Sequence, residues 1–312
     1  MEDILLEKHK TKSIDNHFGA FMARLAGEKW QAIAPVAGMV SMATRAGHAC
    51  LDFRNSPEEW KVISDDEGSE ACWPGQWPPE IKGCPVVGDG PGSTPLVLED
   101  GRLYLRRYWQ YEKDIADYVL LKSGESDRAV DFARLEQGMA RLFPGRRGGV
   151  DWQKLAAMAV LLRPFVVITG GPGTGKTTTL VRIMVLLLEQ QAGEDGLRIA
   201  LAAPTGKGVA RLQAVMAEIG KGLDCQEDIR AKIPTGAMTL HRLLGPIKGS
   251  PFFKFNADNR LPYDLVVVDE ASMVDLPLMA KLTRALPPEA RLVLLGDHNQ
   301  LASVEPGAVL GD

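Results

Sequence analysis

The chain has 312 residues, a mass of 33.9 kDa and a formal net charge of −4. This length is enough for two domains with separate cores, and 45% hydrophobic with 24% charged residues is ordinary for a soluble globular protein. The slightly acidic balance excludes a chain that is basic throughout, so any contact with nucleic acid must be a local patch.

Several classes of protein do not fit the sequence. Four cysteines lack C-x-x-C spacing and a neighbouring histidine cluster, which argues against a zinc or disulfide framework: Cys50, Cys72, Cys84 and Cys225. The amino terminus lacks the basic and apolar segments of a secretion signal, and no apolar run is long enough to span a membrane. We therefore expect a cytoplasmic protein with no membrane partner.

The part of the chain before residue 150 is expected to contain helices and a hairpin. Residues 14–52 show helical apolar spacing, residues 73–94 are rich in Pro and Gly, and residues 96–105 resemble a hairpin with an acidic-glycine turn. A second helix is expected over 129–142. The glycine- and arginine-rich run at 144–149 that follows it is typical of a domain boundary.

A basic-aromatic cluster follows the predicted hairpin and contains Arg106, Arg107, Tyr108, Trp109 and Tyr111. Such a cluster can stack on single-stranded bases. It can equally be a core with a solvated rim, or a face that docks a partner, and the sequence leaves these alternatives open.

After residue 150, apolar runs alternate with helical patterns. The runs are 165–169, 197–202, 265–268 and 292–295. Continuous apolar strands covered by helices predict a parallel sheet that is buried on both faces. We therefore expect an α/β nucleotide-binding domain.

The run from Gly170 to Thr177 fits the phosphate-binding pattern G-x-x-x-x-G-K-[ST] and lies between an apolar strand and a helix. Backbone N–H groups of such a loop surround a β-phosphate, and the helix N-terminus favours the anion. Lys176 is predicted to reach the β- and γ-phosphates, and the Thr177 hydroxyl to bind Mg²⁺. The sequence therefore predicts binding of a nucleoside triphosphate with Mg²⁺.

Two further strand ends carry polar residues. Asp269 follows the apolar run 265–268 and is predicted to bind Mg²⁺, while the adjacent Glu270 orients or deprotonates a water. Gln300 follows the run 292–295 and is placed to sense a γ-phosphate. Together with the phosphate loop, these residues predict hydrolysis of the nucleotide.

Two short segments indicate a second ligand. Thr205 and Lys207 lie where a strand leads into a helix, and Thr239 and His241 repeat this arrangement later in the chain. Both segments can hold the backbone of single-stranded DNA. Helix capping with solvated charge explains the same residues, and the residue pattern alone favours capping.

Five segments occur in order: GGPGTGKTTT, LAAPTGKGVARL, TLHRLLG, VVVDEASM and LLGDHNQLASVEPGAVLGD. Together they resemble the motifs of superfamily 1 DNA helicases, and in detail those of the RecD family, the alpha subunits of bacterial exodeoxyribonuclease V. The front half resembles the RecD amino-terminal domain through IDNHFGAFMARLAG, GHACLDF and PLVLEDGRLYLRRYWQYE.

The resemblance implies a RecA-like P-loop NTPase domain with a parallel sheet over residues 151–312. A smaller, mostly helical α+β domain over 1–120 and a helical linker over 121–150 would precede it. It further implies an ATP-driven motor that moves 5′ to 3′ on single-stranded DNA during double-strand-break repair. RecB-like and RecC-like subunits would be its partners, and the amino-terminal domain would dock on the RecC-like subunit.

The resemblance also assigns roles to individual residues. Lys176, Glu270 and Gln300 would be catalytic, Thr177 and Asp269 would hold the metal, and Gln153 would read the adenine. The remaining assigned nucleotide contacts are Gly171, Gly173, Thr174, Gly175 and Thr178. The assigned DNA contacts are Thr205, Lys207, Thr239 and His241.

The resemblance has one large departure. A helicase of this superfamily has a second RecA-like domain, and an arginine from it completes the ATP site. The sequence stops at Asp312, soon after the third strand motif, so we expect an amino-terminal fragment without that domain. Such an arginine is worth about 10³–10⁵ in rate, so slow hydrolysis is expected. The alternative is a nucleotide-binding, partner-docking module without motor activity; a small-molecule kinase is disfavoured.

Overall fold

The structure is a computed structural model. It describes residues 13–54, 61–63, 70–72, 81–124, 130–144, 149–191, 196–297, 306–307 and 309–310. The chain divides into two compact units. The first holds Met1–Lys113 and the second most of the remaining residues, and the division falls within helix α4 (Arg106–Gly124). The domain bounds expected from the sequence stay a prediction.

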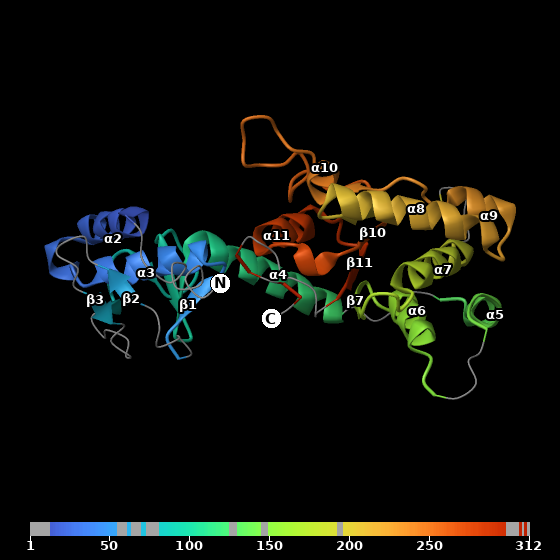
Figure 1. The fold of residues 1–312 in the computed structure, drawn as a ribbon, viewed down its shortest axis with the longest axis horizontal. Coiled ribbons are helices and arrows are strands. Elements are labelled where there is room, and N and C mark those ends of the chain that lie inside the picture. Colours follow the sequence, from blue (N-terminus) through green and yellow to red (C-terminus); the bar gives the residue numbers. More distant parts are fainter. Residues whose placement is uncertain are drawn as a thin grey trace. The chain divides into compact units, whose positions relative to one another are not determined.

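The first unit combines helices with a small sheet (Figure 1). Its helices are α2 (Ser13–Ala26), the 3-10 helix η1 (Glu28–Trp30) and α3 (Ile33–Arg45). The four-stranded sheet has the order β1-β6-β5-β4, with β1 Cys50–Asp52, β6 Arg102–Leu105, β5 Leu96–Glu99 and β4 Val87–Gly88. Strands β2 (Lys61–Ile63) and β3 (Glu70–Cys72) pair separately.

Close packing of α2 on α3 organises this unit. A Cβ built at Gly19 would lie 2.2 Å from the Ala34 carbonyl oxygen, so only glycine allows the helices this approach. Asp15 is fully buried and accepts hydrogen bonds from the Ser41 hydroxyl at 2.7 Å and from Arg45 at 2.9 Å. The small α+β region predicted for the front of the chain is confirmed.

Two local predictions in this unit had different outcomes. The hairpin is confirmed, because β5 pairs antiparallel with β6. The helical expectation for 14–52 is wrong at its end: Cys50–Asp52 is a strand, β1, that pairs antiparallel with β6. Pairing with a strand fifty residues later in the chain decides this conformation, and local periodicity carries no information about it.

Two aromatic residues of the basic-aromatic cluster are buried, whereas Arg107 is exposed. Tyr108 and Trp109 are each only 5% exposed, and the Trp109 indole N–H donates to Glu99 at 3.0 Å. Arg106 donates to the Gly90 carbonyl at 2.9 Å. The alternative of a core with a polar rim therefore fits this cluster, and rings this deeply buried cannot stack on bases.

The second unit contains a five-stranded, all-parallel sheet of order β7-β11-β10-β8-β9. Its strands are β7 Phe165–Thr169, β8 Ile199–Ala203, β9 Met238–Thr239, β10 Leu265–Val268 and β11 Arg291–Gly296. Its longer helices are α5 Phe132–Leu142, α6 Trp152–Leu162, α7 Lys176–Gln190, α8 Gly206–Gly222 and α11 Leu276–Ala285. The shorter helices are α9 Glu227–Lys232, α10 Leu240–Leu244 and the 3-10 helix η3 Ala271–Met273.

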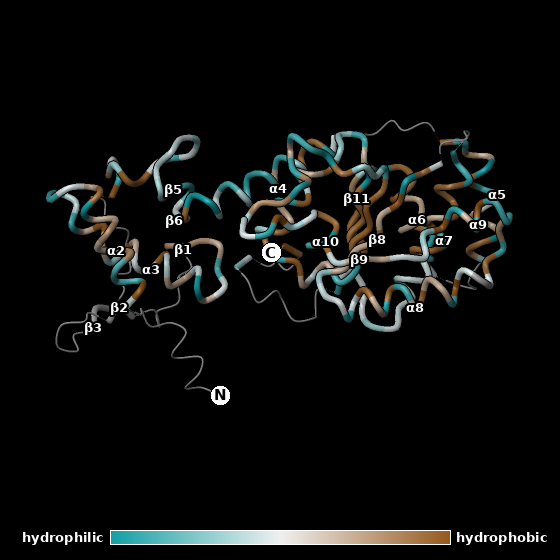
Figure 2. Tube along the Cα trace, turned by 90° about the horizontal axis from the view of Figure 1, so that it is seen from above, coloured by the Kyte–Doolittle hydropathy of each residue, from teal (hydrophilic) through white to brown (hydrophobic). Residues whose placement is uncertain are grey.

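Helices cover both faces of this sheet, as Figures 1 and 2 show. Leu201, Val267 and Val293 pack with α7 and α8 in one hydrophobic cluster. The alternate residues Val266 and Leu292 pack with α10 and α11 in another. The predicted α/β fold with a parallel sheet is confirmed. Burial on both faces holds for β8, β10 and β11 but not for β7, which lies at the edge of the described sheet and leaves Val167 39% exposed.

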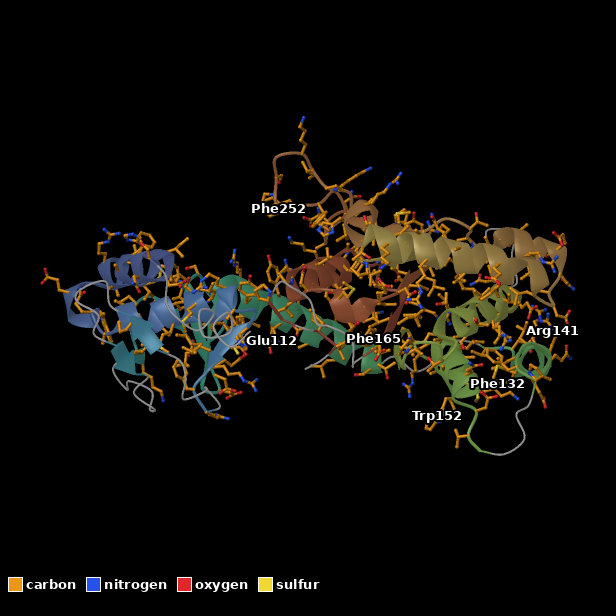
Figure 3. The ribbon with its side chains drawn as sticks, in the orientation of Figure 1. Glu112, Phe132, Arg141, Trp152, Phe165 and Phe252 are labelled. Atoms are coloured by element: carbon orange, nitrogen blue, oxygen red, sulfur yellow. The ribbon has the colours of Figure 1, made fainter. Side chains whose placement is uncertain are left out.

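Helix α5 packs on α7, the helix that follows the phosphate loop. A Cβ built at Gly138 would lie 2.5 Å from Leu186, and Arg141 forms an ion pair with Glu189 at 2.5 Å. Figure 3 labels Arg141 on this helix. Part of the segment expected to be a linker thus contributes to the core of the second unit. None of the helices in the described ranges is long and apolar enough to cross a membrane.

Candidate nucleotide-binding site

The predicted site residues follow the carboxyl ends of the parallel strands, which meet at one edge of the sheet. The phosphate loop follows β7 and Asp269 follows β10, while β11 is followed by Asp297, which was not among the predicted site residues. Thr205 follows β8, and Thr239 ends β9. This order places the nucleotide candidates on three adjacent strands and the DNA candidates on the next two.

The phosphate loop has the backbone that its glycines allow. Gly173 and Gly175 have φ values of 75° and 81°, the left-handed region that other residues rarely adopt. Gly175 is the N-cap of α7, so the helix begins at Lys176. The Lys176 ammonium group donates to the carbonyl oxygens of Gly170 and Gly171, the latter at 3.0 Å.

The loop and the acidic pair face one cavity of about 280 Å³. Its lining includes the predicted residues Gly173, Thr174, Gly175, Lys176, Thr177, Thr178, Asp269 and Glu270. Strand ends separated by about one hundred residues of sequence therefore meet in one pocket. The roles of these residues stay predictions.

Asp269 and Thr177 suit a hydrated divalent cation. The pKa of Asp269 is raised by burial, and the Glu270 N–H, Arg211 and Lys176 partly oppose this shift. One Asp269 oxygen accepts the Glu270 N–H at 2.9 Å. A half-buried carboxylate and a hydroxyl that line the same cavity supply the oxygen ligands that Mg²⁺ prefers, so these residues fit the metal.

Glu270 has an unusual backbone and two neighbours on α8. Its φ of 54° is in the left-handed region, which is uncommon for a residue with a side chain. One carboxylate oxygen lies 3.5 Å from the Thr205 hydroxyl, and the other lies 3.9 Å from the Arg211 guanidinium. Its carboxylate is therefore held between the cavity and the first turns of α8.

Two predicted nucleotide contacts lie outside this lining. The Gln153 side-chain amide donates to the Thr174 carbonyl at 3.2 Å, so it contacts the phosphate loop directly. The Gly171 carbonyl oxygen accepts hydrogen bonds from the Lys176 ammonium group and from the Thr174 hydroxyl. Gln300 lies outside the described residues.

The four predicted DNA contacts lie at two helix starts. Thr205 is the N-cap of α8 and accepts the Gly208 N–H at 3.0 Å; Thr239 is the N-cap of α10 and accepts the Arg242 N–H at 3.2 Å. Capping is therefore present, as the alternative interpretation required. Lys207 and His241 are exposed, so their side chains are accessible to a ligand.

The sequence interpretation missed two charged residues of the cavity, Arg211 and the buried Asp297. A signal for Arg211 was present. Gly208, Arg211 and Val215 have the spacing of one helix face, and Arg211 and Val215 line the cavity. Asp297 directly follows an apolar strand, as Asp269 does.

The parallel sheet, the glycine loop and the helix that begins at Lys176 define a P-loop NTPase domain, a nucleotide-binding class. Comparison with known families agrees. Residues 153–306 match a family described as an AAA domain, and residues 7–104 match the amino-terminal domain of RecBCD enzyme subunit RecD.

Individual relatives are RecD proteins as well. RecBCD enzyme subunit RecD of Mycobacterium tuberculosis is 43% identical over 305 residues, covering 96% of this chain and 49% of the relative. The subunit of the same name from Haemophilus influenzae is 43% identical over 70% of this chain and 35% of the relative. The ATP-dependent RecD2 DNA helicase of Deinococcus radiodurans is 35% identical over 68% of this chain and 26% of its own length. The chain belongs to the RecD family, and it spans about half the length of the curated RecD relatives it matches.

Proposed function

We propose that the second unit binds ATP with Mg²⁺ and hydrolyses it, as the ATP-binding half of a 5′–3′ DNA helicase subunit. The subunit would belong to an exodeoxyribonuclease V-type complex that acts on chromosomal double-strand breaks in the cytoplasm. One observation carries the proposal: the Lys176 loop and the Asp269–Glu270 pair line the same cavity.

Each group has a defined chemical task. Lys176 and the loop N–H groups bind the phosphates, which requires the ammonium group to exchange its loop carbonyl partners for phosphate oxygens. Thr177 and Asp269 would hold Mg²⁺, which neutralises charge on the β- and γ-oxygens when it is bound. Glu270 orients a water and accepts its proton, and Gln153 would read the base from its place against the loop.

Single-stranded DNA is the second proposed ligand. Ala203 is in register with Thr239 across β8 and β9, so the two helix starts that follow these strands are neighbours. Threonine hydroxyls, exposed Lys207 and exposed His241 there can hold a phosphodiester backbone without reading bases. Gln300 would couple the γ-phosphate to motion.

RecC-like and RecB-like subunits are the proposed protein partners, with the first unit docking on the RecC-like one. The relatives' name, RecBCD enzyme subunit RecD, supports this proposal. An apolar stripe on α2 supports it too, because Ile14, Phe21 and Leu25 are 67%, 47% and 54% exposed. A pull-down with the RecC-like protein tests it: replacing Phe21 and Leu25 with Ser should reduce capture, and capture at the wild-type level would exclude this face.

The ATPase rate, measured with and without a single-stranded oligonucleotide, tests the main proposal. Glu270→Gln should leave nucleotide affinity nearly unchanged and lower the hydrolysis rate by about 10²–10⁴-fold, the usual worth of a general base. Glu218→Gln is the matched control, since Glu218 is an exposed residue of α8 outside the cavity lining.

The result also decides between the two functional alternatives. Hydrolysis stimulated by the oligonucleotide supports a motor subunit. Nucleotide binding with negligible turnover, unaffected by the oligonucleotide, supports a docking module without motor activity. Absence of nucleotide binding overturns both.

A further inference from the structure

We propose that the first turn of α8 holds the Glu270 carboxylate at rest and releases it when a nucleic-acid strand occupies Thr205. The inference rests on the proposed function, in which Glu270 activates water and Thr205 contacts the strand. It assigns to Thr205 and Gly208 a positioning role, by which the strand site acts on the carboxylate through a single turn of helix.

Space for the carboxylate is provided by Gly208. A Cβ built at Gly208 would lie 2.5 Å from the nearer Glu270 carboxylate oxygen and 3.1 Å from its carboxylate carbon. Any other residue at this position would displace the Glu270 carboxylate. By contrast, a Cβ built at Gly206, in the same turn, meets no heavy atom within 4 Å among the described residues.

The Thr205 hydroxyl connects the carboxylate to the strand site. Its oxygen accepts the Gly208 N–H at 3.0 Å, and the Glu270 oxygen lies 3.5 Å away on its donor side. A hydroxyl has one hydrogen to donate. A phosphate oxygen bound to Thr205 would take that hydrogen, so the hydroxyl could no longer donate to Glu270.

Arg211 completes the resting arrangement. Its guanidinium lies 3.9 Å from the other Glu270 oxygen, and Arg211 also lines the cavity. Because Arg211 is 65% exposed, its attraction for Glu270 is weak in water. Loss of the Thr205 donor would therefore free the carboxylate to turn toward the water that it activates.

Gly208→Ala tests the inference, with Gly206→Ala as its control. The added Cβ should displace the Glu270 carboxylate from the first turn of α8 and so raise the hydrolysis rate measured without DNA. The ratio of the rate with DNA to the rate without it should then be close to one. Affinities for nucleotide and for an oligo(dT) strand should be kept, because the variant removes no proposed contact. A wild-type ratio in Gly208→Ala, or a lowered unstimulated rate, overturns the inference.

Thr205 gives a second test with a built-in rescue. Thr205→Val loses both the donor and a proposed strand contact, so loss of stimulation alone is not diagnostic. A raised unstimulated rate is diagnostic, because a residue that only contacts DNA has no effect without DNA. Thr205→Ser keeps the hydroxyl and should restore the wild-type rate; an unstimulated rate that is equal in all three proteins overturns the inference.

A third measurement does not depend on turnover. Gly208→Ala should lower the thermal midpoint in the wild-type background and lower it less, or raise it, in a Glu270→Ala background. Equal shifts in both backgrounds overturn the inference. Failure of the proposed function has a different signature, because Glu270→Gln would then hydrolyse ATP as fast as the wild type while the midpoint shifts still differed.

Discussion

At the scale of single residues, Lys176 carries the clearest consequence. Its ammonium group already contacts two loop carbonyls, and it lines the cavity with the acidic pair. Lys176→Ala should weaken binding of a fluorescent ATP analogue by about 10–100-fold, because charge-assisted hydrogen bonds contribute about 1.5–3 kcal/mol each. The fold should persist, as the side chain contributes no core volume.

Lys248→Ala is the matched control for this prediction. Lys248 is exposed in the loop that follows α10, on which Figure 3 labels Phe252. It does not line the cavity. The Lys248→Ala variant should bind the ATP analogue with the affinity of the wild type. Unchanged affinity in Lys176→Ala, with an unchanged circular dichroism spectrum in both variants, would refute the site assignment.

Asp269 predicts a dependence of stability on pH. Burial raises its pKa, so the folded state binds this proton more tightly than the unfolded chain does. Tighter binding of this proton stabilises the folded state. The stabilisation is complete below the ordinary pKa of 3.8 and is lost as pH rises through the folded-state pKa. Asp269→Asn should therefore raise the free energy of urea unfolding at neutral pH, and Mg²⁺ with nucleotide should stabilise it less than the wild type.

Asp264 provides a control of opposite sign. Its pKa is lowered by its hydrogen bond with Arg198, whose guanidinium lies 2.7 Å from one carboxylate oxygen. The hydrogen-bonded carboxylate stabilises the folded state. This stabilisation is present above the ordinary pKa of 3.8 and is lost as pH falls through the lowered pKa of the folded state. Asp264→Asn should thus lower the unfolding free energy at neutral pH, by less than about 1 kcal/mol because the pair is exposed. Changes of the same sign in both variants would contradict the assignment.

The sequence pattern predicts residues whose partners are close in the chain better than residues whose partners are distant. Lys176 and Asp269 are recognised because each directly follows an apolar strand or a glycine loop. The closeness of Arg211 and Thr205 to Glu270 depends on how β8 and β10 pair, which local patterns do not encode. Nothing in the local sequence indicates that position 208 requires glycine. The requirement follows from the pairing of β8 with β10, because a Cβ at this position would meet the Glu270 carboxylate.

At the scale of secondary-structure elements, apolar runs predicted four of the five strands of the described sheet in the second unit, to within two residues at each end. The two-residue edge strand β9 was not predicted. Strongly apolar runs such as Leu265–Val268 are fully buried, so their composition and their environment agree. Prediction failed for β1, a three-residue strand defined by its partner β6, and for the exposed face of β7. The order of the strands decides which strand is central. It depends on contacts between residues far apart in the sequence, so local patterns do not predict it.

Helix α5 supplies a prediction at the same scale. Gly138→Ala would place a Cβ 2.5 Å from Leu186 of α7, so the variant should lose about 1–3 kcal/mol of stability through overpacking. Gly220→Ala on α8 meets no described atom within 4 Å and should gain up to about 1 kcal/mol through helix propensity. Chemical denaturation monitored by circular dichroism measures both changes. Loss of stability in Gly138→Ala would mean that residues 132–142 act as part of the ATP-binding unit, and a neutral result would mean that they act as a linker.

At the scale of the whole molecule, two units with separate cores share helix α4. Each core satisfies the requirement for independent burial, as expected for a chain of this length. The proposed activities divide in the same way, with partner docking in the first unit and nucleotide chemistry in the second. The motifs of the sequence indicated this division, and separate family models match residues 7–104 and 153–306.

This division predicts how a ligand acts on thermal unfolding. A ligand that binds only the folded second unit stabilises that unit by about 2.7 kcal/mol at one hundred times its dissociation constant. Scanning calorimetry with a non-hydrolysable ATP analogue and Mg²⁺ should therefore show one transition moving to higher temperature and a second that does not move. In Lys176→Ala the same transition should move by less, because an affinity that is about 10–100-fold weaker leaves only about 0.4–1.4 kcal/mol of stabilisation at the same ligand concentration. If the wild-type protein shows one transition, or two that shift together, the units unfold as a single cooperative body, and binding energy from the nucleotide would then reach the docking unit directly.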